Sequence, residues 1–226
     1  MPHDEERRVR VKICGIRDAA ALEAAARAGA DFIGLVFYPP SPRHVTVDEA
    51  ARLAELARGR LRTVALVVDA GDAMLAEIAA RVRPDYIQCH GTETPARVAA
   101  IRRLTECPVI RAFRVRRAAD VAAAEAFRPH IAFPLFDAPP AGGAQGGELP
   151  GGRGERFDWT LLRDHPRPFM LAGGLRPDNV AEAIRITRAP MVDVSSGVER
   201  VRGEKDPRLI AAFVRAAREA GEGARG

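Results

Sequence analysis

Eight short apolar runs alternate with eight Ala-rich amphipathic stretches along this 226-residue chain, and this alternation limits the possible folds more than any other feature. The strand-like runs lie at residues 9–15, 31–37, 62–68, 84–89, 108–113, 130–136, 168–172 and 191–194. The helix-like stretches lie near residues 18–29, 46–58, 72–83, 94–105, 117–127, 157–164, 177–187 and 207–220. Each helix would return the chain to a parallel neighbouring strand. A doubly wound sheet could hold these units, but eight of them favour a single-domain α/β fold, the (β/α)8 TIM barrel.

No linker divides the chain, so we expect residues 1–226 to form one domain. Residues 1–8 read as a charged N-terminal extension and residues 221–226 as a flexible tail. The Pro/Gly-rich segment 138–154 falls between the sixth strand and the sixth helix, where it predicts a long flexible loop. In a barrel, the loops that follow the strands line the active face.

Amino-acid composition limits the classes of binding partner and the cellular compartment that we expect for this protein. The net charge of +5 comes from Arg residues that are spread over nearly every predicted helix without aromatic interleaving. This favours a solvated surface and an anionic small-molecule substrate, with no nucleic acid as partner. Three cysteines without framework spacing favour free thiols in a reducing, cytoplasmic environment. Neither a membrane-length apolar run nor a secretory signal is present, so we expect no membrane association. We expect the protein to be a monomer or a homodimer.

The first strand-like run, VRVKICGI, raises a question, because it is apolar yet contains a charge and a thiol. Side chains alternate along a strand, so Lys12 and Cys14 share one face. If that face is the barrel interior, Cys14 lies at the mouth and Lys12 one layer deeper. A charge buried there needs a partner, and Asp193 on the last strand is the candidate. The alternative is that the strand has the opposite phase and Lys12 extends between helices to solvent.

Three Gly-rich segments follow the last three strands: GGRG (151–154), LAGGL (171–175) and SSGVE (195–199). Glycine allows the backbone to approach a phosphate closely with several N–H donors, and this face of a barrel is a frequent phosphate site. Tight turns are the alternative explanation. The predicted phosphate-binding residues are Gly151, Gly152, Gly154, Gly173, Gly174, Ser195, Ser196 and Gly197.

Polar residues at other strand ends are candidates for chemistry. Asp137 ends the sixth strand, where catalytic groups lie in this fold. The alternative is that it is a solvated carboxylate in a turn, which is the more common role of a single Asp. Cys14 needs a nearby cation to act as a base and is otherwise a small buried apolar group. Arg43 lies in a proline-stiffened loop that could present it to a carboxylate, or it is one more surface Arg. His90 could position substrate or simply form a structural hydrogen bond. No His/Cys/Asp cluster has metal-ligand spacing.

Together these segments resemble the phosphoribosylanthranilate isomerase family of tryptophan biosynthesis. The resemblance is carried by KICGI, GADFIGLVFYPPSPRHV, YIQCHG, GGRGERFDW, LAGGLRPDNV and VDVSSGVE, which span nearly the whole chain. It implies a (β/α)8 barrel without cofactor or metal that isomerises a phosphorylated small molecule, N-(5-phospho-β-D-ribosyl)anthranilate.

The resemblance also implies roles for single residues. The general base falls on Cys14, the general acid on Asp137 and the group that binds the anthranilate carboxylate on Arg43. His90 and Asp193 complete the predicted substrate-binding set. An acid and a base must hold opposite protonation states near neutral pH, so we expect the pKa of Cys14 to be lowered.

Two other functions compete with this one. The histidine-pathway isomerase, or a bifunctional version of the two, would carry a carboxylate where Cys14 stands. A non-catalytic sensor of phosphorylated metabolites would keep the phosphate loops but lose the acid and base, and both are present here.

Overall fold

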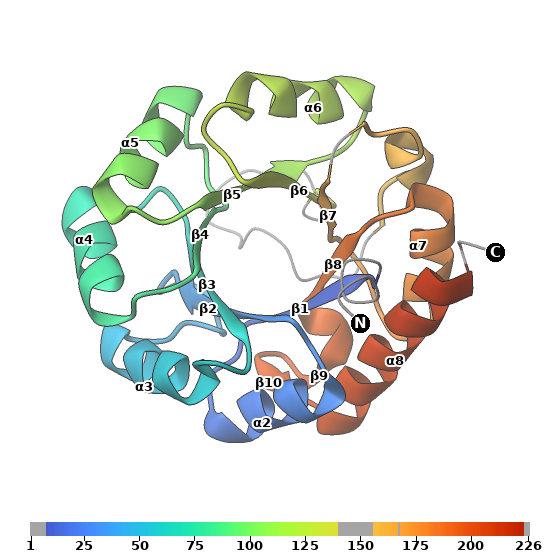
Figure 1. Ribbon diagram of the computed structural model, residues 1–226, viewed down its shortest axis with the longest axis horizontal. Helices are drawn as coiled ribbons and strands as arrows, with labels where there is room; N and C mark the ends of the chain where they lie inside the picture. The colour runs from blue at the N-terminus through green and yellow to red at the C-terminus, as the bar shows by residue number, and fades with distance from the viewer. Residues whose placement is uncertain (1–7, 140–155, 167, 224–226) are drawn as a thin grey trace.

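The chain folds into a closed barrel of parallel strands surrounded by helices (Figure 1). The structure is a computed structural model that describes residues 8–139, 156–166 and 168–223. Within these residues the barrel strands follow the order β1 to β8, and β8 pairs with β1. The strands are β1 (Arg10–Cys14), β2 (Phe32–Phe37), β3 (Arg62–Val67), β4 (Tyr86–Cys89), β5 (Val109–Arg114), β6 (Phe133–Asp137), β7 (Met170–Leu171) and β8 (Met191–Val194). The predicted TIM barrel is therefore confirmed.

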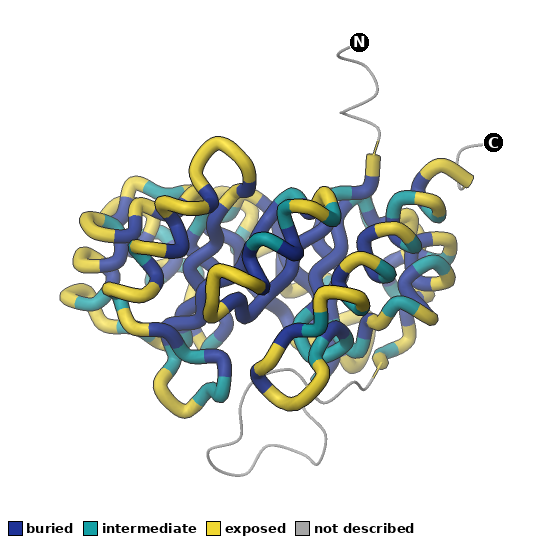
Figure 2. Tube along the Cα trace, turned by 90° about the horizontal axis from the view of Figure 1, so that it is seen from below, coloured by how far each residue is buried: buried dark blue, intermediate teal, exposed yellow. Residues whose placement is uncertain are grey.

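Helices form the outer layer. They are α2 (Ala19–Ala28), α3 (Val47–Ala57), α4 (Asp72–Arg81), α5 (Pro95–Thr105), α6 (Ala118–Ala122), α7 (Val180–Thr187) and α8 (Pro207–Gly223). Short 3-10 helices add η1 (Ala123–Phe127), η2 (Trp159–Leu162) and η3 (Ser196–Val198). Figure 2 shows buried residues gathered in the central strands, with exposed residues on the outer helices and loops. No helix in this part of the chain is long and apolar enough to cross a bilayer.

The strands are apolar on both faces because each face meets other protein. Every residue of β2 is buried. Phe32 belongs to a cluster inside the barrel with Ile110 and Met170, whereas Ile33 and Leu35 belong to the larger cluster between strands and helices. A parallel sheet covered on both sides favours such continuous apolar runs. In this fold the polar side chains that carry chemistry gather at the carboxyl ends of the strands.

Local sequence signals fix where several helices begin and end. Thr46 and Glu49 have capping-box spacing, and in the structure each side chain accepts a hydrogen bond from the other residue's backbone N–H. Asp18 caps α2 in a similar way, and Gly29 ends it in the left-handed conformation. The N-caps Asp18 and Thr46 mark where the βα loops after β1 and β2 end.

Two expectations about elements are wrong, and one element was not expected. The predicted sixth helix at 157–164 is only the four-residue η2, and Pro166 and Pro168 follow too closely for an α-helix to continue. Residues 221–223, predicted to lie in a tail, belong to α8, where Gly221 packs against Val9. A small hairpin after β8 was not predicted; it consists of β9 (Glu199–Val201) and β10 (Glu204–Lys205).

Candidate active site

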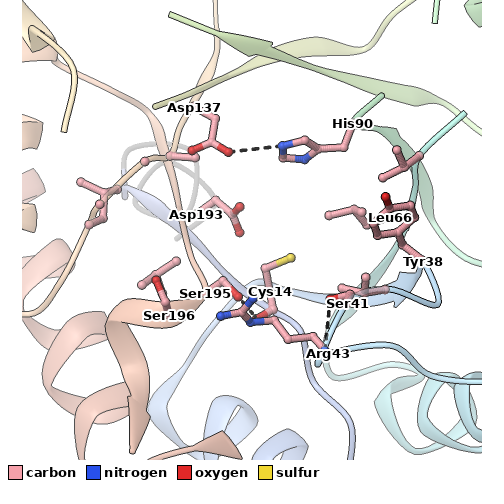
Figure 3. Close-up of a pocket in the computed structure, with 17 residues that line it drawn as sticks. Cys14, Tyr38, Ser41, Arg43, Leu66, His90, Asp137, Asp193, Ser195 and Ser196 are labelled. Atoms are coloured by element: carbon pink, nitrogen blue, oxygen red, sulfur yellow. Dashed lines mark hydrogen bonds and ion pairs between the residues drawn. The ribbon is translucent and has the colours of Figure 1, made fainter. Parts of the chain in front are cut away.

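The five side chains proposed from the sequence for catalysis or substrate binding line one pocket at the carboxyl ends of the strands (Figure 3). They are Cys14, Arg43, His90, Asp137 and Asp193. Cys14 ends β1, Asp137 ends β6 and His90 directly follows β4. The pocket encloses about 700 Å³ of space that protein atoms do not fill, counting the part open to solvent.

Lys12 and Asp193 form an ion pair inside the barrel, as predicted. They are register partners across the β1–β8 seam, and Lys12 Nζ lies 3.0 Å from Asp193 Oδ1. Lys12 has no exposed surface. Burial alone lowers the pKa of Lys12, but Asp193 and Cys14 raise it above the ordinary lysine value. A positive charge is therefore held one layer below the thiol.

The prediction that the pKa of Cys14 is lowered is wrong for this structure. Burial raises the pKa of the Cys14 thiol, and the Asp193 carboxylate adds to the rise. Lys12 and Lys205 act in the opposite direction and offset only part of it. Burial disfavours the charged form of any acid, and at this depth it outweighs the neighbouring cations.

Gly34 on β2 gives the thiol its space. It is the register partner of Cys14, and a Cβ at this position would lie 2.8 Å from Cys14 Sγ and 3.1 Å from Lys12 Nζ. Any larger residue would therefore displace the thiol or the ammonium. No sequence motif marks Gly34, because a close approach across a parallel ladder leaves no local signal.

Asp137 and His90 face each other on the other side of the pocket (Figure 3). His90 Nε2 lies 3.3 Å from Asp137 Oδ2. Asp137 Oδ1 accepts a hydrogen bond of 2.8 Å from the backbone N–H of Ala138. Gln88, whose side chain lies one layer deeper on β4, approaches His90 Nδ1 with its amide nitrogen at 3.0 Å. The candidate acid is thus contacted by one imidazole and one backbone amide.

Arg43 lines the pocket but is buried and paired, which its loop position alone did not predict. Its Nε and Nη2 donate to the two carboxylate oxygens of Glu199 at 2.6 and 2.8 Å. Lys205 Nζ lies 2.8 Å from the same carboxylate. Both Glu199 and Lys205 come from the hairpin β9–β10, which no sequence motif predicted. Two cations share one carboxylate here, and no described residue accepts a hydrogen bond from Arg43 Nη1.

Charge pairing keeps Glu199 ionised in this cluster. Burial on its own raises the pKa of Glu199, but Arg43 and Lys205 lower it below the ordinary glutamate value. Lys205 also donates to the backbone oxygen of Ser195 at 3.0 Å, and the Ser195 hydroxyl donates to the backbone oxygen of Cys14. The hairpin is therefore connected to the loop after β8 and to the end of β1.

Two of the predicted phosphate-binding glycines are required by packing between loops. A Cβ on Gly173 would lie 2.3 Å from the backbone nitrogen of Ala138, and one on Gly197 would lie 1.9 Å from the backbone oxygen of Leu175. Gly173 and Gly174 also have positive φ, a conformation that favours glycine. The loops after β6, β7 and β8 are therefore in direct contact at the pocket.

The same loops offer backbone donors. Gly173, Gly174, Ser195 and Ser196 belong to the loops that line the pocket, and Ser196 opens the short helix η3. No carbonyl in the described part of the chain accepts a hydrogen bond from the N–H groups of Gly173, Gly174, Ser196 or Gly197. The other three predicted phosphate residues, Gly151, Gly152 and Gly154, lie outside the described residues.

The other two cysteines, Cys89 and Cys107, lie in different surroundings from Cys14. Burial raises the pKa of Cys89 to about 12, and Cys107 directs its thiol at backbone oxygens, including that of Pro84 at 3.4 Å. Neither thiol lines the pocket. Across residues 8–139, 156–166 and 168–223, no group of three or more His, Cys, Asp or Glu side chains is placed to hold a metal ion.

Comparison with known proteins agrees with this geometry. Residues 11–216 match the family model for N-(5'-phosphoribosyl)anthranilate (PRA) isomerase. A curated relative of that name from Rhodopseudomonas palustris is 54% identical over 210 residues, covering 92% of this chain and 95% of its own. Another from Paramagnetospirillum magneticum is 52% identical over 212 residues, covering 93% and 97%.

Solved structures give the same answer. The crystal structure of phosphoribosyl anthranilate isomerase from Thermotoga maritima has a TM-score of 0.82 and 33% identity, covering 93% of this chain and 99% of its own. A phosphoribosyl anthranilate isomerase solved in complex with reduced 1-(o-carboxyphenylamino)-1-deoxyribulose 5-phosphate has a TM-score of 0.80 and 32% identity, with the same coverage. Sequence, fold and pocket converge, and the chain belongs to the N-(5'-phosphoribosyl)anthranilate isomerase family.

Proposed function

We propose that the pocket at the carboxyl ends of the strands performs the family's reaction with Asp137 as general acid and Cys14 as general base. The protein is an isomerase of tryptophan biosynthesis. It converts N-(5-phospho-β-D-ribosyl)anthranilate to 1-(2-carboxyphenylamino)-1-deoxy-D-ribulose 5-phosphate by an Amadori rearrangement. The observation that supports the residue assignment is that the Cys14 thiol and the Asp137 carboxyl group line opposite sides of the same pocket (Figure 3).

The acid opens the sugar ring. Asp137, in its protonated form, gives its proton to the ribose ring oxygen while the bond from that oxygen to C1′ breaks. The nitrogen lone pair forms the Schiff base, and Asp137 is left as a carboxylate. Two N–H groups near this carboxylate, from Ala138 and from His90 when Nε2 carries its proton, would stabilise the charge.

The base completes the rearrangement. The Cys14 thiolate removes the C2′ proton, and the electron pair of that C–H bond forms the enolamine, which then ketonises. Burial raises the pKa of this thiol, so its thiolate is scarcer but is a stronger base toward a carbon acid. Lys12 and Lys205 favour the thiolate through their charges. Each placed proton transfer contributes about 10²–10⁴-fold to the rate.

The substrate's two anionic ends fit opposite parts of the pocket. Arg43 keeps Nη1 available for the anthranilate carboxylate, because Glu199 occupies its other two nitrogens. The cluster of Arg43, Glu199 and Lys205 carries one more positive than negative charge, and a substrate carboxylate would balance it. At the other end, the backbone N–H groups of Gly173, Gly174, Ser195, Ser196 and Gly197 would bind the phosphate, together with Gly151, Gly152 and Gly154.

Steady-state turnover with the anthranilate-fluorescence signal tests the assignment. Cys14→Ala and Asp137→Asn should each reduce kcat by about 10²–10⁴-fold while the circular dichroism spectrum is unchanged. Near-wild-type turnover of Cys14→Ala would show that the thiol is not the base. Turnover of the histidine-pathway isomerase's substrate by the wild-type protein would indicate a bifunctional enzyme, and binding without any turnover would indicate a sensor.

Further proposals concern location and assembly. We place the enzyme in the cytoplasm, in keeping with its free thiols. The large exposed apolar side chains of the described residues are scattered, on α3 (Leu56), α5 (Leu104) and β9 (Val201). Single exposed apolar residues do not form an interface patch. Of the two expected states, monomer or homodimer, this distribution favours the monomer, and sedimentation over a range of protein concentrations would separate them.

A further inference from the structure

A buried glutamine lies inside the barrel one layer below the catalytic pocket. Gln88 is on β4 and has no exposed surface. Its amide nitrogen lies 3.0 Å from His90 Nδ1. Its oxygen Oε1 is buried and has no hydrogen-bond partner among the described residues. An unpaired buried polar atom costs about 1–3 kcal/mol, and an apolar side chain of the same length would avoid that cost.

The orientation of this amide determines which His90 nitrogen carries a proton. A neutral imidazole has one N–H and one lone pair. With the Gln88 NH2 group facing Nδ1, the Nδ1 atom must accept, so the proton sits on Nε2. Turning the amide by 180° would instead leave the whole NH2 group without an acceptor. Buried carbonyl oxygens tolerate this situation better than buried N–H groups do, which supports the first orientation.

His90 links the orientation of the Gln88 amide to the candidate acid, Asp137. Its Nε2, the ring nitrogen that does not face Gln88, lies 3.3 Å from Asp137 Oδ2, and Figure 3 marks this contact with a dashed line. The ring is not aligned for a full hydrogen bond in the structure. Catalytic hydrogen bonds often tighten only when substrate binds. An Nε2–H at this place can donate to the carboxylate that remains after Asp137 has given up its proton.

We propose that Gln88 is a positioning residue that fixes the His90 ring and its tautomer, so that an N–H group faces Asp137 each time this acid loses its proton. The proposal rests on the assignment of Asp137 as the acid. Gln88 itself touches no reacting atom. It acts through His90, as buried partners of catalytic imidazoles commonly do.

The ring nitrogens can be observed directly by ¹⁵N NMR of protein labelled at its five histidines. Spectra at about pH 8, where an ordinary imidazole is neutral, should show His90 protonated at Nε2, with Nδ1 as a hydrogen-bonded acceptor. His90→Asn assigns the signals by their disappearance. In Gln88→Met the Nδ1 signal should move to the position of a free lone pair, while the other four histidines are unchanged. An Nδ1–H tautomer in the wild-type protein, or no change in Gln88→Met, would overturn the proposal.

Kinetics test whether the contact serves catalysis. Gln88→Met should lower kcat roughly ten- to a hundredfold and leave KM within about twofold. In a His90→Asn background the same substitution should have no further effect on kcat, because the ring it positions is gone. Tyr86→Phe is the matched control, since Tyr86 is on the same strand and packs against Phe32 and Phe133. It should keep wild-type kcat.

These experiments distinguish failure of the Gln88 proposal from failure of the assignment of Asp137 as the acid. If Gln88→Met lowers kcat equally with and without His90, Gln88 has only a structural role and the inference fails. If Asp137→Asn retains turnover, the acid assignment fails, whereas the NMR result still decides whether Gln88 sets the tautomer.

Discussion

Removing one partner of the buried Lys12–Asp193 ion pair should destabilise the barrel strongly, because the other partner is left as an unpaired buried charge. Two unit charges 3.0 Å apart attract by about 5–6 kcal/mol at an effective dielectric constant of about 20. Lys12 is fully buried, so an unpaired ammonium would have no water nearby. Breaking such a pair typically costs about 3–5 kcal/mol. We therefore expect Lys12→Met and Asp193→Leu each to lower the free energy of unfolding by about that amount.

The double variant separates the charge effect from packing. Replacing both partners by apolar side chains leaves no stranded charge, so the loss should be smaller than the sum of the single losses by at least about 1 kcal/mol. Urea unfolding followed by circular dichroism and by the fluorescence of the single Trp159 gives the four free energies. Val11→Ala and Val192→Ala form the control cycle, because Val11 and Val192 are buried register partners on the same two strands. A coupling energy for Lys12 and Asp193 no larger than the control's would refute the reasoning.

Three further predictions concern the pocket. Asp193→Asn removes a negative charge that raises the pKa of the Cys14 thiol, so the thiol limb of the kcat/KM profile should move to lower pH; a limb that stays or rises contradicts this. Arg43→Ala should raise KM by the equivalent of about 1.5–3 kcal/mol, the usual contribution of a hydrogen bond to a charged group, and an unchanged KM would exclude Arg43 from substrate binding. Gly34→Ala would place a Cβ 2.8 Å from Cys14 Sγ, so kcat should fall more than KM changes; wild-type kcat in a folded variant would show that the thiol needs no such space.

The architecture could be predicted because periodicity and topology determine it. Strands buried on both faces must be apolar throughout, and parallel strands require crossovers, so eight repeats leave few folds. The Lys12–Asp193 pair followed from the same logic. Once the phase of the first strand and closure of the barrel are assumed, the first and last strands are neighbours and a buried cation needs an anion.

The missed parts depend on distances that no local pattern encodes. Glu199 and Lys205 come from strands of three and two residues, which are too short to show any period. Their contact with Arg43 joins segments more than 150 residues apart. The pKa of Cys14 depends on the balance between burial and neighbouring charges, and the sequence shows the charges but not the depth.

The seam between β1 and β8 makes catalytic competence a consequence of chain completion. Cys14 leaves the ribosome early, but Asp193 and Lys205, which set the charges around it, are made about 180 residues later. Without β8, β1 would be an edge strand paired only with β2, and Lys12 would lack the Asp193 carboxylate. With Cys14 as the proposed base, activity would therefore report closure of the barrel.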